Sequence, residues 1–153
     1  MFIWKSNFNS QLFNEKIFYS RFIKDLENSQ KEVIIESPYL TASRMTVLYP
    51  IFQVLLKRRV KIHIVTRDPI DHDDEYLRHQ ATNELLNSME LGINIILLQG
   101  SHHRKIAIID RKILWEGSLN ILSYFKSREV MRRLAGGNHA INMFRFLKLN
   151  DLL

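Results

Sequence analysis

The spacing of apolar residues predicts helices and strands in alternation over the first two thirds of the chain. Between residues 11 and 28 apolar positions recur every three or four residues, which predicts an amphipathic helix. Its apolar stripe consists of Phe13, Ile17, Phe18, Phe22, Ile23 and Leu26. The apolar run 33–35 predicts a short strand that stops at Ser37-Pro38. Residues 43–59 repeat the helical pattern and lead into a second strand, 60–66.

The acidic run 71–75 fits the positive end of a third helix, which we expect to continue to about Leu91 and to end at Gly92. A strand over 93–98 follows. Strands that alternate with helices of about fifteen residues indicate an α/β fold. We expect a largely parallel sheet with helices on both faces.

The pattern changes after Gly100. Two apolar stretches, 105–109 and 113–115, flank Asp110-Arg111-Lys112 and predict a β-hairpin with a short turn. We also expect a strand over 130–134. A closing helix over 138–149 follows the break at Gly136-Gly137.

The composition limits the possible classes of protein. The 153 residues contain no repeat and no Pro/Gly/Ser-rich linker, so we expect one domain that spans 1–153. The absence of cysteine excludes disulfides, iron–sulfur clusters, Cys-ligated zinc and a cysteine nucleophile. No apolar run is long enough to cross a bilayer, and the start MFIWKSN lacks the order of a secretory leader. We therefore expect a cytoplasmic protein without a membrane partner.

The net charge of +6 is concentrated at one end of the chain. Residues 1–100 carry 12 basic and 12 acidic side chains, whereas residues 101–153 carry 10 basic and 4 acidic ones. Such a segment favours a polyanionic partner, either nucleic acid or an anionic lipid headgroup. The alternative is a set of helices that each have a solvated basic face.

The chemistry-bearing residues lie in and after the predicted hairpin. His103 and Lys105 are two residues apart, so on a strand both point to one side, while Asp110 falls at the turn. Gly117 allows a close approach of backbone to a ligand, and Ser118 and Asn120 offer a hydroxyl and an amide to an anionic oxygen. Antiparallel pairing would return this Gly-Ser-x-Asn turn to His103.

An acidic residue follows the same turn. Glu129 is a candidate to hold a ring nitrogen of an imidazole and so fix its orientation. The alternative for Glu129 is a surface carboxylate paired with Arg128 or Arg132. His103 and Lys105 would likewise be an ordinary strand edge if the Gly-Ser-x-Asn turn were not placed beside them.

Taken together, His-x-Lys-x4-Asp over 103–110, Gly-Ser-x-Asn over 117–120 and the later Glu129 resemble the phospholipase D superfamily. Residues 33–40, VIIESPYL, look like the first core strand of that family and the turn after it. The resemblance implies an αβα sandwich around a mixed, largely parallel sheet. The run 117–133 looks most like the single-motif domains attached to or related to DNA nucleases and helicases, so two contexts are open: a separate protein, or a part of a larger helicase or nuclease polypeptide.

The motif occurs once, whereas active sites of this superfamily use two His-x-Lys pairs that face each other. The resemblance therefore implies a homodimer in which His103 of each chain meets across a two-fold axis. One imidazole would attack phosphorus to give a phosphohistidine, and the opposite imidazolium would protonate the leaving oxygen. Lys105 and Asn120, with help from Ser118, would hold the phosphate oxygens without a metal ion or other cofactor. We expect Asp110 to make a structural hydrogen bond at the turn.

Other charged clusters have simpler explanations. Consecutive residues Asp71-His72-Asp73-Asp74 cannot all converge on one ion, so we interpret them as a solvated helix start rather than a metal site. The basic run Lys57-Arg58-Arg59 fits compensation of a helix dipole. The sequence thus predicts a DNA phosphodiesterase, with two alternatives: a phospholipase or transphosphatidylase acting on lipid headgroups, and a non-catalytic DNA-binding module.

Overall fold

The computed structural model describes residues 9–153, and the MFIWKSN start on which the absence of a leader was argued lies outside them. The strands are β1 (Asn9–Asn14), β2 (Glu32–Glu36), β3 (Lys61–Arg67), β4 (Asn94–Leu98), β5 (Ile106–Ile109), β6 (Ile113–Gly117) and β7 (Val130–Ala135). The helices are α1 (Phe18–Glu27), α2 (Ala42–Lys57), α3 (Glu75–Leu91) and α4 (His139–Phe146), with 3₁₀ turns at Pro69–Asp71 and Leu149–Asp151.

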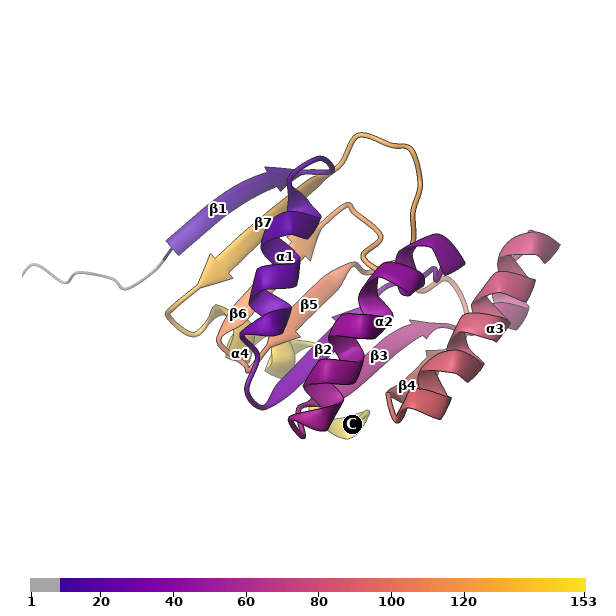
Figure 1. Cartoon of the computed structure of the whole chain (residues 1–153). Coiled ribbons are helices and arrows are strands. Elements are labelled where there is room, and N and C mark those ends of the chain that lie inside the picture. Colours follow the sequence, from indigo (N-terminus) through magenta and orange to yellow (C-terminus); the bar gives the residue numbers. More distant parts are fainter. Residues whose placement is uncertain (1–8) are drawn as a thin grey trace, which may run out of the picture.

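All seven strands form one mixed sheet in the order β1-β7-β6-β5-β2-β3-β4 (Figure 1). Only β2–β3 and β3–β4 pair in parallel, and the other four neighbouring pairs are antiparallel. The mixed α/β architecture is as predicted, but the predominance of parallel pairs is not observed. The reason is topological, because a hairpin and two further antiparallel strands extend the sheet beyond β2.

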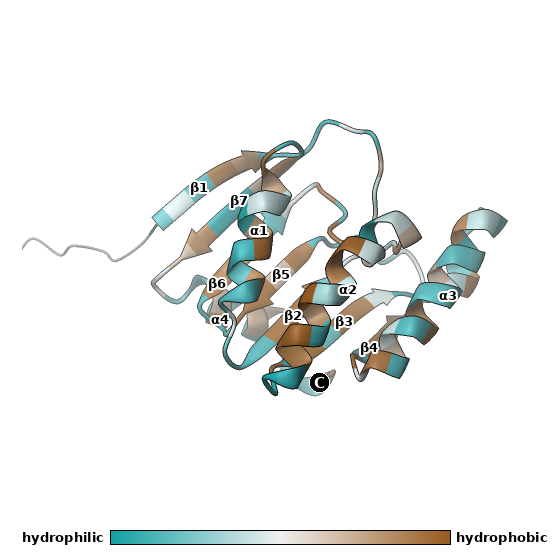
Figure 2. Cartoon of the chain, viewed as in Figure 1, coloured by the Kyte–Doolittle hydropathy of each residue, from teal (hydrophilic) through white to brown (hydrophobic). Residues whose placement is uncertain are grey.

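Helices cover both faces of the sheet, which makes an αβα sandwich. Helices α1, α2 and α3 lie over one face, and α4 packs on the other, in the background of Figure 1. Bands of brown and teal alternate along α1 and α2 in Figure 2, as expected for helices with one apolar side. The larger core lies under α1 and α2 and includes Trp115, Phe18 and Phe22, all fully buried. No helix within residues 9–153 combines the length and apolarity needed to cross a membrane.

The N-terminal part of the predicted 11–28 helix is wrong. Residues 9–14 form the edge strand β1, which pairs antiparallel with β7, and α1 begins only at Phe18. Phe13 belongs to the strand and packs on Trp115, with 4.9 Å between ring centroids. A partner more than 100 residues away in the sequence thus overrides the local helical pattern.

The acidic run before α3 is divided between separate roles. Asp74 is the N-cap of α3, and its side chain accepts a hydrogen bond from the backbone N–H of Leu77 at 2.8 Å. Asp71 instead accepts a hydrogen bond from the backbone N–H of Gly100 at 2.8 Å and lies outside the helix. Helix α3 begins at Glu75, the last residue of the acidic run. Gly92 ends the helix as predicted, with φ of 95°.

The β5–β6 hairpin is confirmed, and Asp110 ties its turn to the segment before β2. One carboxylate oxygen of Asp110 accepts from the backbone N–H groups of Lys31 (2.8 Å) and Glu32 (2.9 Å) and from Ser29 Oγ (3.2 Å). The other oxygen accepts from the N–H of Gln30 at 2.9 Å. Burial alone would raise the pKa of Asp110, but these N–H donors outweigh it and hold the pKa below its ordinary value.

We predict that Asp110→Asn lowers the free energy of unfolding by about 2 kcal/mol at pH 7, because the amide cannot accept all these bonds and loses the charge. The contribution of a carboxylate with a lowered pKa is complete above its unfolded value, roughly 3.9, and is lost as pH falls through the folded pKa. Urea unfolding of both proteins between pH 7 and pH 3 should therefore show a difference in the free energy of unfolding that becomes smaller on acidification. A difference that does not change with pH would contradict this explanation.

Candidate active site

His103 and Lys105 lie side by side in the segment between β4 and β5. Lys105 Nζ donates to His103 Nδ1 at 2.8 Å and to the His103 carbonyl oxygen at 2.7 Å. Both residues line an open groove of about 560 Å³ together with Gly117 and Ser118. The His103 side chain is exposed there, whereas Lys105 is half-buried. The two side chains are in contact, although both residues precede β5 and do not lie on the strand from which their common direction was predicted.

The neighbouring His102 points the opposite way and supports the segment from behind. Its Nε2 lies 3.2 Å from Oε1 of the buried Glu36, and Arg104 Nε donates to the same oxygen at 2.7 Å. Burial raises the pKa of Glu36 against the opposing effect of Arg104. Burial, followed by the charges of Arg104 and Lys105, lowers the pKa of His102 to about 4, so His102 is neutral at pH 7.

The Gly-Ser-x-Asn turn follows β6 directly. The register Ile106↔Glu116 places Gly117 next to Lys105. A Cβ atom at Gly117 would lie 2.2 Å from the carbonyl oxygen of Val130, so the close approach of β7 requires glycine at this position. Ser118 exchanges hydrogen bonds with Val130, N–H to carbonyl at 2.9 Å and Val130 N–H to Ser118 Oγ at 3.1 Å.

Glu129 lies beside Ser118 at the entry to β7. Ser118 Oγ donates to Glu129 Oε2, and Ser127 Oγ donates to Oε1 at 2.5 Å. Burial lowers the pKa of Lys105, and the negative charge of Glu129 partly offsets that effect, which places the two charges within range of each other. Within residues 9–153 no hydrogen bond joins Glu129 to His103, so one copy of the chain does not make the carboxylate–imidazole contact considered from the sequence.

Asn120 lines a second cavity, of about 510 Å³, which it shares with Glu129. Its Oδ1 is buried and has no hydrogen-bond partner among the described residues. The structure thus gathers His103, Lys105 and Ser118 around one groove and places Asn120 in the adjoining cavity, with the Ser118–Glu129 contact between the two. Asp110 lies at the far end of the hairpin, away from this group.

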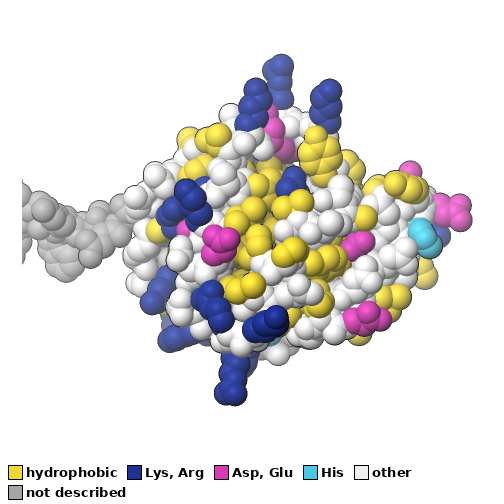
Figure 3. Space-filling view, viewed as in Figure 1, with side chains coloured by type: hydrophobic (Ala, Val, Ile, Leu, Met, Phe, Trp, Pro, Cys, Tyr) yellow, Lys and Arg dark blue, Asp and Glu magenta, His cyan; other side chains and the backbone are white. Residues whose placement is uncertain are grey.

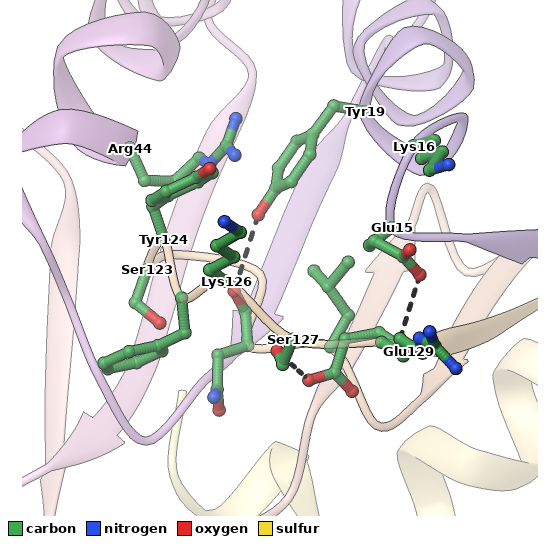
Figure 4. A pocket seen from close by; sticks show the side chains of 13 residues that line it. Glu15, Lys16, Tyr19, Arg44, Ser123, Tyr124, Lys126, Ser127 and Glu129 are labelled. Atoms are coloured by element: carbon green, nitrogen blue, oxygen red, sulfur yellow. Dashed lines mark hydrogen bonds between the residues drawn. The ribbon is translucent and has the colours of Figure 1, made fainter.

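The cavity also contains residues that the sequence reasoning missed. Tyr19 from α1, Arg44 from α2 and Tyr124 from the loop before β7 lie on one side of it, opposite Glu15 and Glu129 (Figure 4). The aromatic and basic run 124–128, YFKSR, is a signal that could have been recognised in the sequence. Nothing local marks Tyr19 or Arg44, because only the packing of α1 and α2 brings them to the cavity.

The described part of the chain holds no cluster of three or more histidine and acidic side chains arranged to bind a metal ion. The groove instead presents the ammonium of Lys105 beside the imidazole of His103, together with Ser118, whose hydroxyl hydrogen is donated to Glu129. An ammonium can hold an anionic oxygen next to an imidazole, a ring that can act as a nucleophile.

Comparison with known proteins identifies the family. The family described as cardiolipin synthase, PLD-like domain, matches residues 22–134. NucT from Helicobacter pylori has a similar structure, with a TM-score of 0.71 and 18% identity over 95% of this chain and 96% of that one. Nuc from Salmonella typhimurium, a phospholipase D family member, has a TM-score of 0.71 and 15% identity over 93% of each chain.

A longer protein contains the same fold as one part. Phosphatidylserine synthase from Haemophilus influenzae gives a TM-score of 0.74 and 12% identity over 97% of this chain but 39% of its own. None of the curated proteins matches the sequence. The family match covers well over half of the chain, including β2, the hairpin and the Gly-Ser-x-Asn turn. The chain therefore belongs to the phospholipase D superfamily.

Proposed function

We propose that this chain is a metal-independent phosphodiesterase, an endonuclease that acts on DNA in the cytoplasm through an active site shared by two copies. The observation that carries the proposal is the pairing of Lys105 with His103 in an open groove that Ser118 also lines, with Glu129 hydrogen-bonded to Ser118. The ammonium can hold a phosphate oxygen there while an imidazole attacks phosphorus.

The reaction has two steps. The neutral imidazole of His103 forms a bond to phosphorus, and the bond to the leaving oxygen breaks as the protonated imidazole of the second copy donates its proton. A water molecule then forms a bond to phosphorus as the phosphorus–nitrogen bond to His103 breaks, and the second imidazole accepts the proton of the water. Lys105 and Asn120, with Ser118, stabilise the charge on the non-bridging oxygens, which is the work that a metal ion performs in other nucleases.

The groove has an apolar side on which a second copy could pack. Besides His103 and Lys105, the groove is lined by Met143, Phe146 and Leu147 of the α4 region. The Phe146 side chain is 81% exposed and forms, with these two neighbours, an apolar patch that a partner would bury. A second copy that packs against this ring would bring the two His103 side chains toward one axis and exclude water from the site.

Nucleic acid fits the charge of the surroundings. Arg104 and Lys105 line the groove, and Lys126 and Arg128 line the adjoining cavity. A related fold occurs in TrmBL2, an archaeal chromatin protein described as showing a novel mode of DNA binding, with a TM-score of 0.59 and 14% identity over 93% of this chain and 50% of that one. A backbone of regularly spaced phosphates would be attracted to this surface, and its binding affinity would fall as the salt concentration rises.

We predict that the purified protein cleaves single- or double-stranded DNA in the presence of EDTA and that His103→Ala lowers kcat by about a thousandfold, because it removes both the nucleophile and the proton donor. Gel and fluorescence assays of labelled oligonucleotides would measure this.

His79→Ala serves as the matched control, because this histidine is exposed on α3 and lines neither the groove nor the cavity, and it should retain activity. Hydrolysis of phospholipid vesicles without DNA cleavage would favour the lipid-headgroup alternative. Salt-sensitive DNA binding without cleavage under any condition would favour the non-catalytic module.

We predict that Phe146→Glu converts a dimer to a monomer and lowers the cleavage rate at least tenfold, because a charge would be buried at the contact and half of the site would be lost. Sedimentation equilibrium of wild-type and variant protein gives the masses directly. Tyr76→Glu replaces another exposed ring, 71% accessible on α3, and should leave the dimer intact. A fully active wild-type monomer would contradict the shared site.

A further inference from the structure

The cavity beside the groove has the size of a small-molecule site. It lies between α1, α2 and the loop 120–129, and its volume of about 510 Å³ falls in the range of small-molecule sites, roughly 300–1,000 Å³. Asn120 and Glu129 belong to its wall, so an occupant would lie directly next to the proposed phosphate site.

Besides Asn120 Oδ1, two further buried polar atoms in the cavity wall lack partners among the described residues. The hydroxyl of Ser123, a residue that is 4% exposed, makes no hydrogen bond, and neither does Nε of Arg44. Buried polar atoms are almost always paired, because an unpaired one loses the hydrogen bonds that water would provide. An occupant with a polar edge would satisfy both atoms.

Aromatic rings line the same cavity. The guanidinium of Arg44 lies 3.3 Å from the ring centroid of Tyr19 and 5.8 Å from that of Tyr124 (Figure 4). Tyr124 and Phe125 are 59% and 43% exposed, so their faces are free to stack on a flat ligand. A flat ring with polar edges therefore suits the cavity better than an alkyl chain.

Ring contacts connect the cavity with the reacting imidazole. Phe125 lies edge-on to Tyr39 with 5.8 Å between centroids, and Tyr39 lies edge-on to His103 at 6.3 Å. A chain molecule that places a phosphate at His103 would thus pass along these rings with its neighbouring unit at the cavity.

The loop is held in place before any ligand binds. Tyr19 donates its hydroxyl hydrogen to the carbonyl of Ile121 at 2.7 Å, and the N–H of Thr41 donates to the carbonyl of Leu122 at 3.1 Å. The N–H of Tyr124 donates to Thr41 Oγ1 at 2.9 Å. Binding therefore costs little ordering of the loop backbone.

The charges around the cavity suit an anionic chain. Lys16, Lys126 and Arg128 line its rim, and Lys and Arg side chains gather at the upper edge of Figure 3, where Figure 1 places the loop before β7. Of the two acidic residues there, Glu15 already accepts a hydrogen bond from the backbone N–H of Glu129. A flat, polar-edged ring attached to a negatively charged backbone describes a nucleotide unit.

We propose that this cavity holds one nucleobase of a single-stranded nucleic acid beside the cleaved phosphate, so that single strands are the substrate class. Tyr124 or Phe125 stacks on the base, and Ser123 with Arg44 Nε binds its polar edge. In a duplex the bases are paired and stacked, and none can enter. The inference rests on the proposed phosphodiesterase function for its biological meaning, but base binding can be measured without cleavage.

The test compares an oligothymidylate with a chain of the same length and charge that lacks all bases, at one fixed salt concentration. Fluorescence anisotropy in a His103→Ala background keeps the probes intact. We expect the base-bearing strand to bind more tightly than the abasic chain and than a duplex. Tyr124→Ala should weaken binding of the base-bearing strand about tenfold, the loss expected for one stacked base, and leave the abasic chain within twofold.

Tyr76→Ala, which removes an exposed ring from α3, is the matched control and should change neither affinity. Ser123→Ala should also weaken only the base-bearing strand, and circular dichroism checks that this buried site still folds. Equal affinity for base-bearing and abasic chains, or an equal loss for both in Tyr124→Ala, would overturn the inference. Base-dependent binding by a wild-type protein that cleaves nothing would support the base-binding cavity and refute the proposed function. Cleavage by a protein whose binding does not depend on the bases would support the proposed function and refute the base-binding cavity.

Discussion

The arrangement of this site depends on one interaction at the hairpin turn, in which the Asp110 carboxylate accepts four hydrogen bonds from residues 29–32. This contact fixes the turn of the β5–β6 hairpin against the start of β2, in the register Val33↔Ile109. Side chains alternate between the faces of a strand, so a shift of the pairing by one residue would turn the Lys105 side chain to the other face of the sheet. The same shift would move Gly117 away from its close contact with Val130. A carboxylate at one end of the hairpin thereby helps to fix the positions of the groove residues at the other end.

Local patterns predicted most of the elements because their signals are local. Helices α2 and α3, the hairpin and the helix end at Gly92 follow from apolar spacing and from turn residues within a few positions. Strand β1 could not be predicted, because its apolar residues fit a helical stripe and only its pairing with β7 makes it a strand. The proportion of antiparallel pairs was misjudged for a related reason, since strand order depends on long-range contacts that periodicity does not contain.

The same distinction applies to the site. Lys105 and His103 are two residues apart in the sequence, so their proximity was predictable, although they lie just before β5 rather than on a strand. The hydrogen bond from Ser118 to Glu129 forms only when the hairpin and β7 are placed together. From the sequence, Glu129 could be recognised only as a candidate acid, and the partner considered for it was an imidazole. Tyr19 and Arg44 come from two helices with no motif, so their meeting over the loop before β7 is a product of packing alone.

The hydrogen bond between Lys105 and His103 determines which nitrogen of the neutral imidazole carries the proton. An ammonium can only donate, so Nδ1 of the imidazole accepts, and the single proton of the neutral ring must then sit on Nε2. In that tautomer neither ring nitrogen presents a free lone pair, so the proposed nucleophile could not react. A phosphate that draws the ammonium away would free the lone pair of Nδ1, so in the proposed reaction the charge of the substrate would itself activate His103.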